Sequence, residues 1–196
     1  MNTPRKYQTM LSSLGLSLDK SIFSEKSGYC FYTLRIKSSD ITTLKKLKKA
    51  KIELPERLSL SKLLNRKDEL IGMILWLSPD EFLVIFDGNK GFEIVDTIEQ
   101  TIKKSNAILL DVSGAYSFFS LQGNKGQDTL SQLCYYDLTD LTENKVISSV
   151  LLQAPMIFFR TGRLESSKLS TIHLLVRNSF AVYVHKIIKK SIKNIS

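Results

Sequence analysis

The sequence has 196 residues, a formal net charge of +9 and 43% hydrophobic residues. That apolar fraction suffices for an ordinary core, which excludes a disordered or fibrous chain. No apolar run approaches the roughly 18 uninterrupted positions that a membrane helix needs, so we expect no membrane partner.

The N-terminus and the cysteines favour a soluble protein in a reducing cytoplasm. The segment from Met1 to Leu18 contains two basic residues. After them, apolar and polar positions alternate, so the segment forms no secretory apolar stretch. Cys30 and Cys134 lie far apart and outside any C-x-x-C pattern. Their spacing indicates neither a disulfide framework nor a zinc site.

The positive charge raises the question of nucleic-acid binding. Lysine supplies 21 of the 28 basic residues, whereas specific phosphate and base contacts favour the planar guanidinium of Arg. Tyr and Phe fall mostly on predicted strands with apolar neighbours, not beside arginines as base stacking would require. We therefore expect no specific nucleic-acid partner.

The residue pattern predicts an N-terminal arm, residues 1–26, followed by one body, residues 27–196. In the arm, Leu14, Leu16 and Leu18 are candidates for docking on another surface. The body divides into two halves, at about 27–105 and 106–196, with the same order of elements.

The first half is predicted to run strand, helix, strand, strand, helix. Asp40 is a good N-cap for a helix that starts at Ile41. Its apolar stripe is expected to hold Ile41, Leu44 and Leu47, with lysines on its wet side. After Leu54-Pro55, the stretch to Arg66 is predicted to be a connection with one short helical turn. The other predicted elements are a strand at 29–36, a hairpin of 70–77 and 81–86 around Ser78-Pro79-Asp80, and a helix at about 91–104.

The second half repeats this order, which suggests a structural duplication in pattern and not in residue identity. We therefore predict an α+β fold of two related strand-helix-strand-strand-helix halves, with helices facing the sheets. Its predicted elements are strands at 107–113 and 116–121, a helix at about 124–134, strands near 148–160 and at 171–176, and a helix at 179–190.

Asp111 carries the most informative side chain, because it is a carboxylate in the apolar strand AILLDVS and is expected to be buried. As a functional group it would be a general base or an iminium-stabilising acid of raised pKa. As a structural group it would accept backbone N–H groups of the Ser-Gly turn that follows. We favour the structural interpretation.

The two histidines and two glycines carry weaker signals. His173 is expected opposite the apolar face of its strand, and His185 lies on the last helix; without an acidic or thiol neighbour, each is expected to be a surface or capping residue. Gly123 and Gly126 open a helix but match neither a Walker loop nor a dinucleotide fingerprint. We interpret Gly123 as a sharp strand-to-helix turn, and predict no catalytic, cofactor-binding or metal residue.

Four segments in the same order resemble the gamma subunit family of heterotetrameric sarcosine oxidases. They are Leu54-Pro55, LSPDEFLV at 77–84, DVSGAYSFFSLQGNKGQDTLSQLCYYDL at 111–138 and LLVRNSFAVYVHKII at 174–188. Ser78 and Phe82 depart from the family's glycine and tryptophan. The residues that carry the motif are Asp111, Ser113, Gly123, Leu130, Asp137, Leu138, Ser179 and Phe180.

The resemblance implies a fold like the folate-binding domain of glycine-cleavage aminomethyltransferases. It also implies a complex with alpha, beta and delta subunits that oxidatively demethylates sarcosine to glycine, with one-carbon transfer to tetrahydrofolate. FAD, FMN, NAD and tetrahydrofolate would be associated with the larger subunits, none with this chain. The chain itself would be non-catalytic.

The alternative is a stand-alone folate-binding protein of the aminomethyltransferase type. Those enzymes place a catalytic aspartate beside an asparagine in the first half, whereas this chain offers only Asp68-Glu69 and Asp80-Glu81 around its hairpin. They also carry further domains that enclose the folate. We therefore prefer the subunit interpretation.

Overall fold

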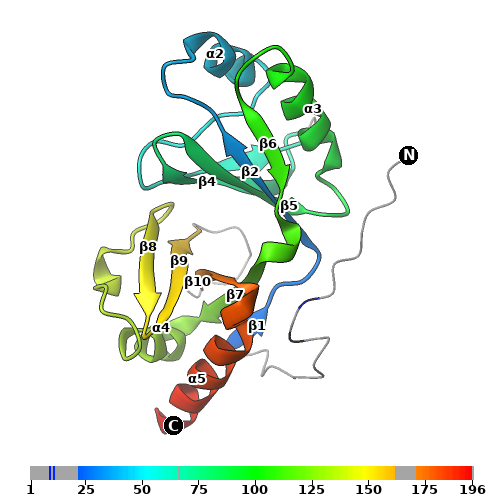
Figure 1. The fold of residues 1–196 in the computed structure, drawn as a ribbon. Helices are drawn as coiled ribbons and strands as arrows, with labels where there is room; N and C mark the ends of the chain where they lie inside the picture. Colours follow the sequence, from blue (N-terminus) through cyan, green and yellow to red (C-terminus); the bar gives the residue numbers. More distant parts are fainter. Residues whose placement is uncertain (1–8, 10, 12–21, 66, 162–170, 196) are drawn as a thin grey trace. The chain divides into compact units, whose positions relative to one another are not determined.

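The computed structural model describes residues 9, 11, 22–65, 67–161 and 171–195 (Figure 1). The predicted docking residues Leu14, Leu16 and Leu18 lie outside the described residues. The chain forms two compact units. The first comprises Gly28–Gly114, and the second comprises Ala115–Ser196 together with the short strand β1, Phe23–Glu25.

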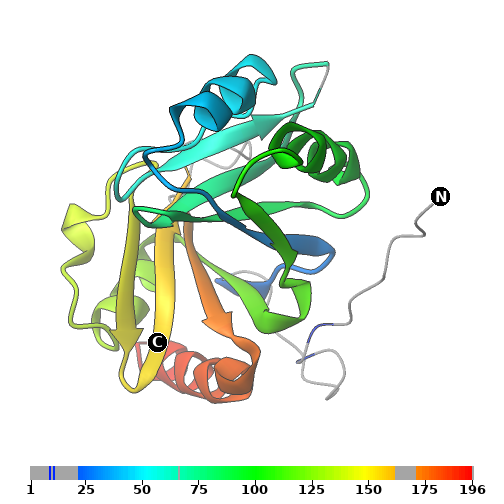
Figure 2. The ribbon, with the colours of Figure 1, turned by 45° about the horizontal axis from the view of Figure 1, so that its top comes forward.

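The first unit is a five-stranded antiparallel sheet with two helices, α2 and α3, on one face (Figures 1 and 2). The strand order is β3-β4-β5-β2-β6. The elements are β2 (Tyr29–Arg35), α2 (Ile41–Lys49), β3 (Leu60–Leu64), β4 (Leu70–Ser78), β5 (Glu81–Asp87), α3 (Phe92–Ile102) and β6 (Ile108–Asp111).

The core of the first unit forms because alternate strand residues point to the helix face. On β5 these are Phe82, Val84 and Phe86, and they pack with Leu47 of α2 and Ile98 of α3. Both helices present apolar residues at three- and four-residue steps, so each contributes one stripe to the same core.

The second unit is also a five-stranded antiparallel sheet with helices on one face. Its strand order is β1-β7-β10-β9-β8. Leu174 of β10 and Phe119 of β7 pack against Val184 and Ile188 of the last helix. The elements are β7 (Tyr116–Gln122), α4 (Gly123–Ser131), η2 (Leu138–Asp140), β8 (Val146–Leu151), β9 (Ala154–Arg160), β10 (Thr171–Arg177), η3 (Asn178–Phe180) and α5 (Ala181–Asn194). The short η1 (Ser113–Ala115) contains the last residues of the first unit and the first residue of the second.

The α+β class predicted from the sequence is confirmed, with helices facing two antiparallel sheets. Three strands differ from the sequence prediction. β1 lies within the predicted arm and pairs with β7, and β6, assigned to the second half, pairs with β2 of the first unit. The stretch after Pro55, expected to be a connection with a helical turn, contains β3, whose Ser61 and Lys62 pair with Ile74 and Met73 of β4. Its apolar residues Leu60, Leu63 and Leu64 do not alternate with polar ones, so the two-residue period that identifies a strand in a sequence is absent.

No helix in the part of the chain that the structure describes is both long and apolar enough to cross a bilayer. Cys30 and Cys134 are both buried and have free thiols.

The β4–β5 hairpin requires a glycine at position 72. A Cβ at Gly72 would lie 2.1 Å from the carbonyl oxygen of Ile85 and 2.8 Å from Cα of Phe86, both backbone atoms of the paired strand. We predict that Gly72→Ala lowers the free energy of unfolding by roughly 1–3 kcal/mol, because one strand must shift to admit the methyl group. Urea denaturation of the isolated chain measures this change.

Gly114→Ala is the matched control. A Cβ at Gly114 meets no atom within 4 Å, so this variant should unfold close to the wild type. Equal stability of the two variants would show that the hairpin accommodates the methyl group.

Candidate functional site

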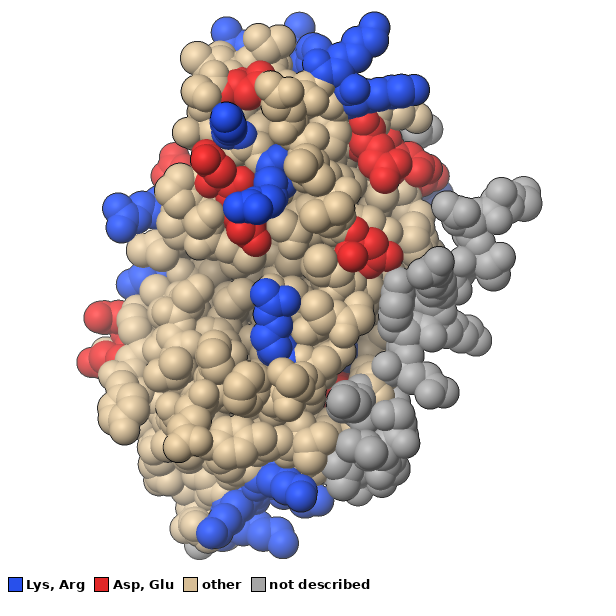
Figure 3. All heavy atoms as spheres, viewed as in Figure 1, with Lys and Arg blue, Asp and Glu red and all other residues tan. Residues whose placement is uncertain are grey.

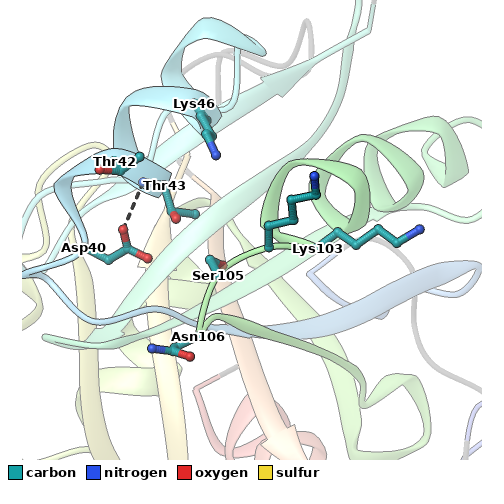
Figure 4. A pocket seen from close by; sticks show the side chains of 8 residues that line it. Asp40, Thr42, Thr43, Lys46, Lys103, Ser105 and Asn106 are labelled. Carbon is teal, nitrogen blue, oxygen red and sulfur yellow. Dashed lines mark hydrogen bonds between the residues drawn. The ribbon is translucent and has the colours of Figure 1, made fainter.

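A polar pocket lies in the first unit between the start of α2 and the end of α3, with a cavity volume of about 540 Å³. Lys and Arg side chains gather on the part of the first unit where these helices lie (Figure 3). Figure 4 shows the residues that line the pocket. They are Asp40, Thr42, Thr43, Lys46, Lys103, Lys104, Ser105 and Asn106, which we call the lysine pocket.

The α2 side of the lysine pocket is organised by the predicted helix cap. Oδ1 of Asp40 accepts a hydrogen bond from the backbone N–H of Thr43 at 3.1 Å, which satisfies one of the free donors of the first turn (Figure 4). Hydrogen bonds from the side chain and the backbone of Thr43 lower the pKa of Asp40, and the positive charge of Lys46 lowers it further. The carboxylate is therefore ionised and engaged in the cap.

The α3 side of the lysine pocket is a tight turn held by Ser105. Its backbone N–H and its hydroxyl both donate to the carbonyl oxygen of Ile102, each at 2.8 Å. The same hydroxyl accepts the backbone N–H of Ala107 at 3.1 Å. These bonds fix the chain direction immediately after Lys103 and Lys104, so both lysines stand at the end of the helix.

The side chains that line the lysine pocket carry a net positive charge. The pocket contains three ammonium groups and one carboxylate, which is already bound within its own helix turn. Among the described residues, neither Lys103 nor Lys104 forms an ion pair. Ammonium groups beside hydroxyl and amide donors are suited to bind carboxylate or phosphate oxygens.

Sequence reasoning missed this pocket. It placed Lys46 on the wet side of a helix and assigned no role to Lys103 and Lys104. The adjacent lysine pair at a predicted helix end was a signal, but only the folded unit brings it beside Asp40. No group of three or more His, Cys, Asp or Glu that could hold a metal occurs among the residues that the structure describes.

Asp111 and Ser113 stabilise the strand end where β6 leaves its sheet. Oδ1 of Asp111 accepts the backbone N–H of Ser113 at 2.9 Å, and the buried Oγ of Ser113 accepts the backbone N–H of Phe31 at 3.0 Å. The expectation that Asp111 is buried was wrong, because β6 is an edge strand and leaves the carboxylate exposed. The structural role of Asp111 stays a prediction.

Three further motif residues begin helix α4 or follow it in the chain. Gly123, the first residue of α4, has a φ of +70°, a conformation that favours glycine. Oδ1 of Asp137 accepts the backbone N–H and the hydroxyl of Thr139 at 2.9 and 2.7 Å, and these bonds lower the pKa of Asp137. Leu138 is buried in the core of the second unit.

The last two motif residues precede α5. Ser179 is exposed, whereas Phe180 is half-buried and packs against the core of the second unit. Asp111 and Ser113 belong to the first unit and the other motif residues to the second. Within each unit the motif residues cap turns, begin helices or fill the core.

His185 differs from the expectation of a surface or capping residue. His185 is only 2% exposed, because it falls on the apolar stripe of α5 with Ala181, Val184 and Ile188. Its ring stacks on Phe23 with centroids 6.2 Å apart. The position one turn after Ala181 was the sequence signal for this burial.

His173 is half-buried and contacts two aromatic rings. Its ring lies 5.4 Å from that of Phe118 and 5.0 Å from that of Phe159, between centroids. Nε2 is 2.9 Å from the hydroxyl oxygen of Thr161. Burial lowers the pKa of His173 to about 3, and the positive charge of Lys26 adds to the shift. The imidazole is therefore neutral at physiological pH.

Solved structures share this arrangement of two sheet-and-helix units. A chain of the heterotetrameric sarcosine oxidase from Corynebacterium sp. U-96, solved with pyrrole 2-carboxylate, matches with a TM-score of 0.79 and 19% identity, over 96% of this chain and 95% of that one. The glycine cleavage system aminomethyltransferase T from Bartonella henselae matches with a TM-score of 0.63 and 12% identity, over 85% of this chain and 44% of that one. These matches define the class as an aminomethyltransferase-like fold.

The sequence comparisons narrow this class to one family. The family model described as "Sarcosine oxidase, gamma subunit family" matches residues 49–193. The sarcosine oxidase subunit gamma of Corynebacterium sp. (strain U-96) is 31% identical over 91 residues, which is 45% of this chain and 43% of that relative's length. The aligned part thus spans less than half of that relative. Because the family model covers more than half of this chain, the chain belongs to the sarcosine oxidase gamma subunit family.

The depressed pKa of His173 predicts a pH dependence of stability. The unfolded imidazole titrates near 6.5 and the folded one near 3, so the folded state binds fewer protons between these values. The contribution of His173 is fully present above about pH 6.5 and is lost as the pH falls toward 3. We predict that His173→Phe, which can retain the ring contacts, shows a shallower loss of unfolding free energy from pH 7 to 4.

Urea denaturation of both proteins at several pH values measures the difference in slope. Because all other titratable groups are common to the two proteins, the difference isolates His173. Parallel curves would show that the folded imidazole titrates near its ordinary pKa.

Proposed function

We propose that this chain is the non-catalytic gamma subunit of a cytoplasmic, heterotetrameric sarcosine oxidase complex and that it acts by assembly. The observation that carries this proposal is the family match over residues 49–193. The likeness of nearly the whole chain to one chain of the Corynebacterium heterotetramer supports it.

The proposed partners are the alpha, beta and delta subunits. The complex would oxidatively demethylate sarcosine to glycine and pass the one-carbon unit to tetrahydrofolate. We propose that FAD, FMN, NAD and tetrahydrofolate are bound by the larger subunits and not by this chain.

The lysine pocket does not fit the ring of a flavin or a folate. Its lining consists of charged side chains, hydroxyls and one amide, without an aromatic or aliphatic residue. Pteridine and isoalloxazine rings require mostly apolar walls with a few polar contacts. We therefore propose that none of these cofactors binds in the lysine pocket.

A stand-alone folate-binding protein of the aminomethyltransferase type is the second candidate. The fold shared with aminomethyltransferase T favours it, but this chain corresponds to only 44% of that enzyme. Function depends on the residues of a site and not on a fold. The family match therefore favours the subunit.

The first test is co-expression with the alpha, beta and delta subunits. We predict that the chain co-purifies with them in a one-to-one ratio, measured by size-exclusion chromatography with light scattering. The isolated chain should be colourless, should not bind tetrahydrofolate in calorimetry and should not oxidise sarcosine. Folate binding by the isolated chain, without co-purification, would support the second candidate.

Asp111 provides a second test, because it is the carboxylate that could make this subunit catalytic. If its role is the turn at Ser113, Asp111→Asn should lower the free energy of unfolding by about 1 kcal/mol. The turnover of each assembled complex should be unchanged. Removal of a general base would instead lower turnover by roughly 10²–10⁴-fold without affecting folding.

Asp96→Asn is the control for the loss of one negative charge, since Asp96 is exposed on the same unit. It should change neither stability nor turnover. Thermal melting and sarcosine oxidation, normalised to assembled complex, separate the outcomes. Full assembly with collapsed turnover in Asp111→Asn alone would assign chemistry to this chain.

A further inference from the structure

In the order of the chain, the first unit is inserted into the second. All five strands of the first sheet come from the continuous segment Gly28–Gly114. The second sheet takes β7 to β10 from the segment after Gly114, but its edge strand β1 comes from the segment before Gly28. The second unit is therefore complete only when two distant parts of the chain meet.

β1 contributes both pairing and core contacts to the second unit. It pairs antiparallel with β7, and beside this pairing the backbone N–H of Lys26 donates to the carbonyl oxygen of Phe118 at 2.7 Å. Phe23 is only 2% exposed, and its ring centroid lies 5.3 Å from that of Phe119. Without β1, the second unit would lose a buried aromatic ring and one side of β7 would be unpaired.

Folding of the first unit brings β1 and β7 together. β2 directly follows β1 and β6 directly precedes β7, and β2 and β6 pair antiparallel in the first sheet. At the end of this pairing, the backbone N–H of Val112 donates to the carbonyl oxygen of Phe31 at 2.8 Å. Residues 23–35 and 108–121 thus pair antiparallel in both sheets, and we call these two segments the shared ribbon.

The shared ribbon shortens the loop that β1–β7 pairing must close. When the first unit is unfolded, the loop comprises residues 26–115. When the β2–β6 pairing has formed, only the few residues beside the change of unit remain. The probability of loop closure falls roughly as the 3/2 power of loop length, so shortening the loop from about 90 to about 10 residues favours closure roughly 30-fold.

We propose that the second unit folds only when the first unit is folded, because the shared ribbon delivers β1 to β7. β1 has three residues, and strand pairs this short are not stable by themselves. A partner that binds and stabilises the first unit would therefore also stabilise the second. This inference goes beyond the proposed function and does not depend on it.

The two cysteines allow the unfolding of each unit to be followed separately. Cys30 lies in the core of the first unit and Cys134 in the core of the second, and both are free thiols. A brief pulse of iodoacetamide at increasing urea concentrations labels each thiol once it is exposed, and mass spectrometry distinguishes the two. We expect Cys134 to be labelled wherever Cys30 is labelled. A urea range in which Cys30 reacts while Cys134 stays protected would overturn the proposal.

Gly72→Ala sharpens this test, because it destabilises the first unit selectively. Two independent units would leave Cys134 of this variant protected at urea concentrations that expose Cys30. We expect both thiols to react, at lower urea than in the wild type. Ile98→Val, which removes one methylene from the core of the first unit, replaces Gly72→Ala if that variant does not fold.

A tether between β1 and β7 tests whether the shared ribbon causes this dependence. Ser24 lies opposite Ser120, with hydroxyl oxygens 2.7 Å apart, a separation that suits the double substitution Ser24→Cys, Ser120→Cys and an engineered disulfide. In the Gly72→Ala background, the oxidised variant should keep Cys134 protected at urea concentrations where Cys30 reacts. The reduced form of the same variant is the control and should lose this protection. Identical labelling of the two forms would show that the ribbon is not the cause, and the proposal would be wrong.

Discussion

The antiparallel pairing of β2 with β6 is the interaction on which the candidate site depends. In this register Arg35 lies opposite Ile108. Asp40 follows Arg35 by five residues, and Asn106 precedes Ile108 by two, so the pairing brings the start of α2 to the end of α3. The same pairing places Val112 N–H 2.8 Å from the carbonyl oxygen of Phe31 and lets Ser113 bind the N–H of Phe31. The pocket and the motif DVSG therefore share one structural cause.

The lysine pocket combines a stable helix cap with three lysine side chains. Asp40 is committed to the first turn of α2, so its charge stabilises the helix and leaves little to neutralise Lys103 and Lys104. A surface with unbalanced like charges is not optimal for an isolated chain.

The histidines of the second unit differ in their surroundings from the lysines of the first unit. His173 and His185 lie among aromatic and aliphatic side chains, and His173 is kept neutral by its surroundings. They contribute to packing in the way that large apolar residues do. The chain belongs to the sarcosine oxidase gamma subunit family and shares its fold with an aminomethyltransferase. Because the fold is common to both, individual residues must determine whether such a protein acts by assembly or by catalysis.

Local chemistry in the sequence was sufficient for the elements that depend on neighbouring residues. The cap at Asp40, the β4–β5 hairpin and the helix that follows it were predicted from capping, turn residues and apolar period, because these signals act within a few residues. The ordered motifs were sufficient for the family and for the α+β class. The predicted order of strands and helices indicated which residues are buried. It did not indicate which strands pair with each other.

Tertiary structure alone decided what depends on contacts between distant segments. β3 forms because β4 is available to pair with it, although its apolar residues do not follow the two-residue period of a strand. Asp111 is exposed because β6 lies at a sheet edge, which no local pattern encodes. Lys46, Lys103 and Lys104 become one pocket only through the β2–β6 pairing, since more than 50 residues separate Lys46 from the other two. Sequence determines the properties of each side chain, whereas long-range pairing determines which of them meet.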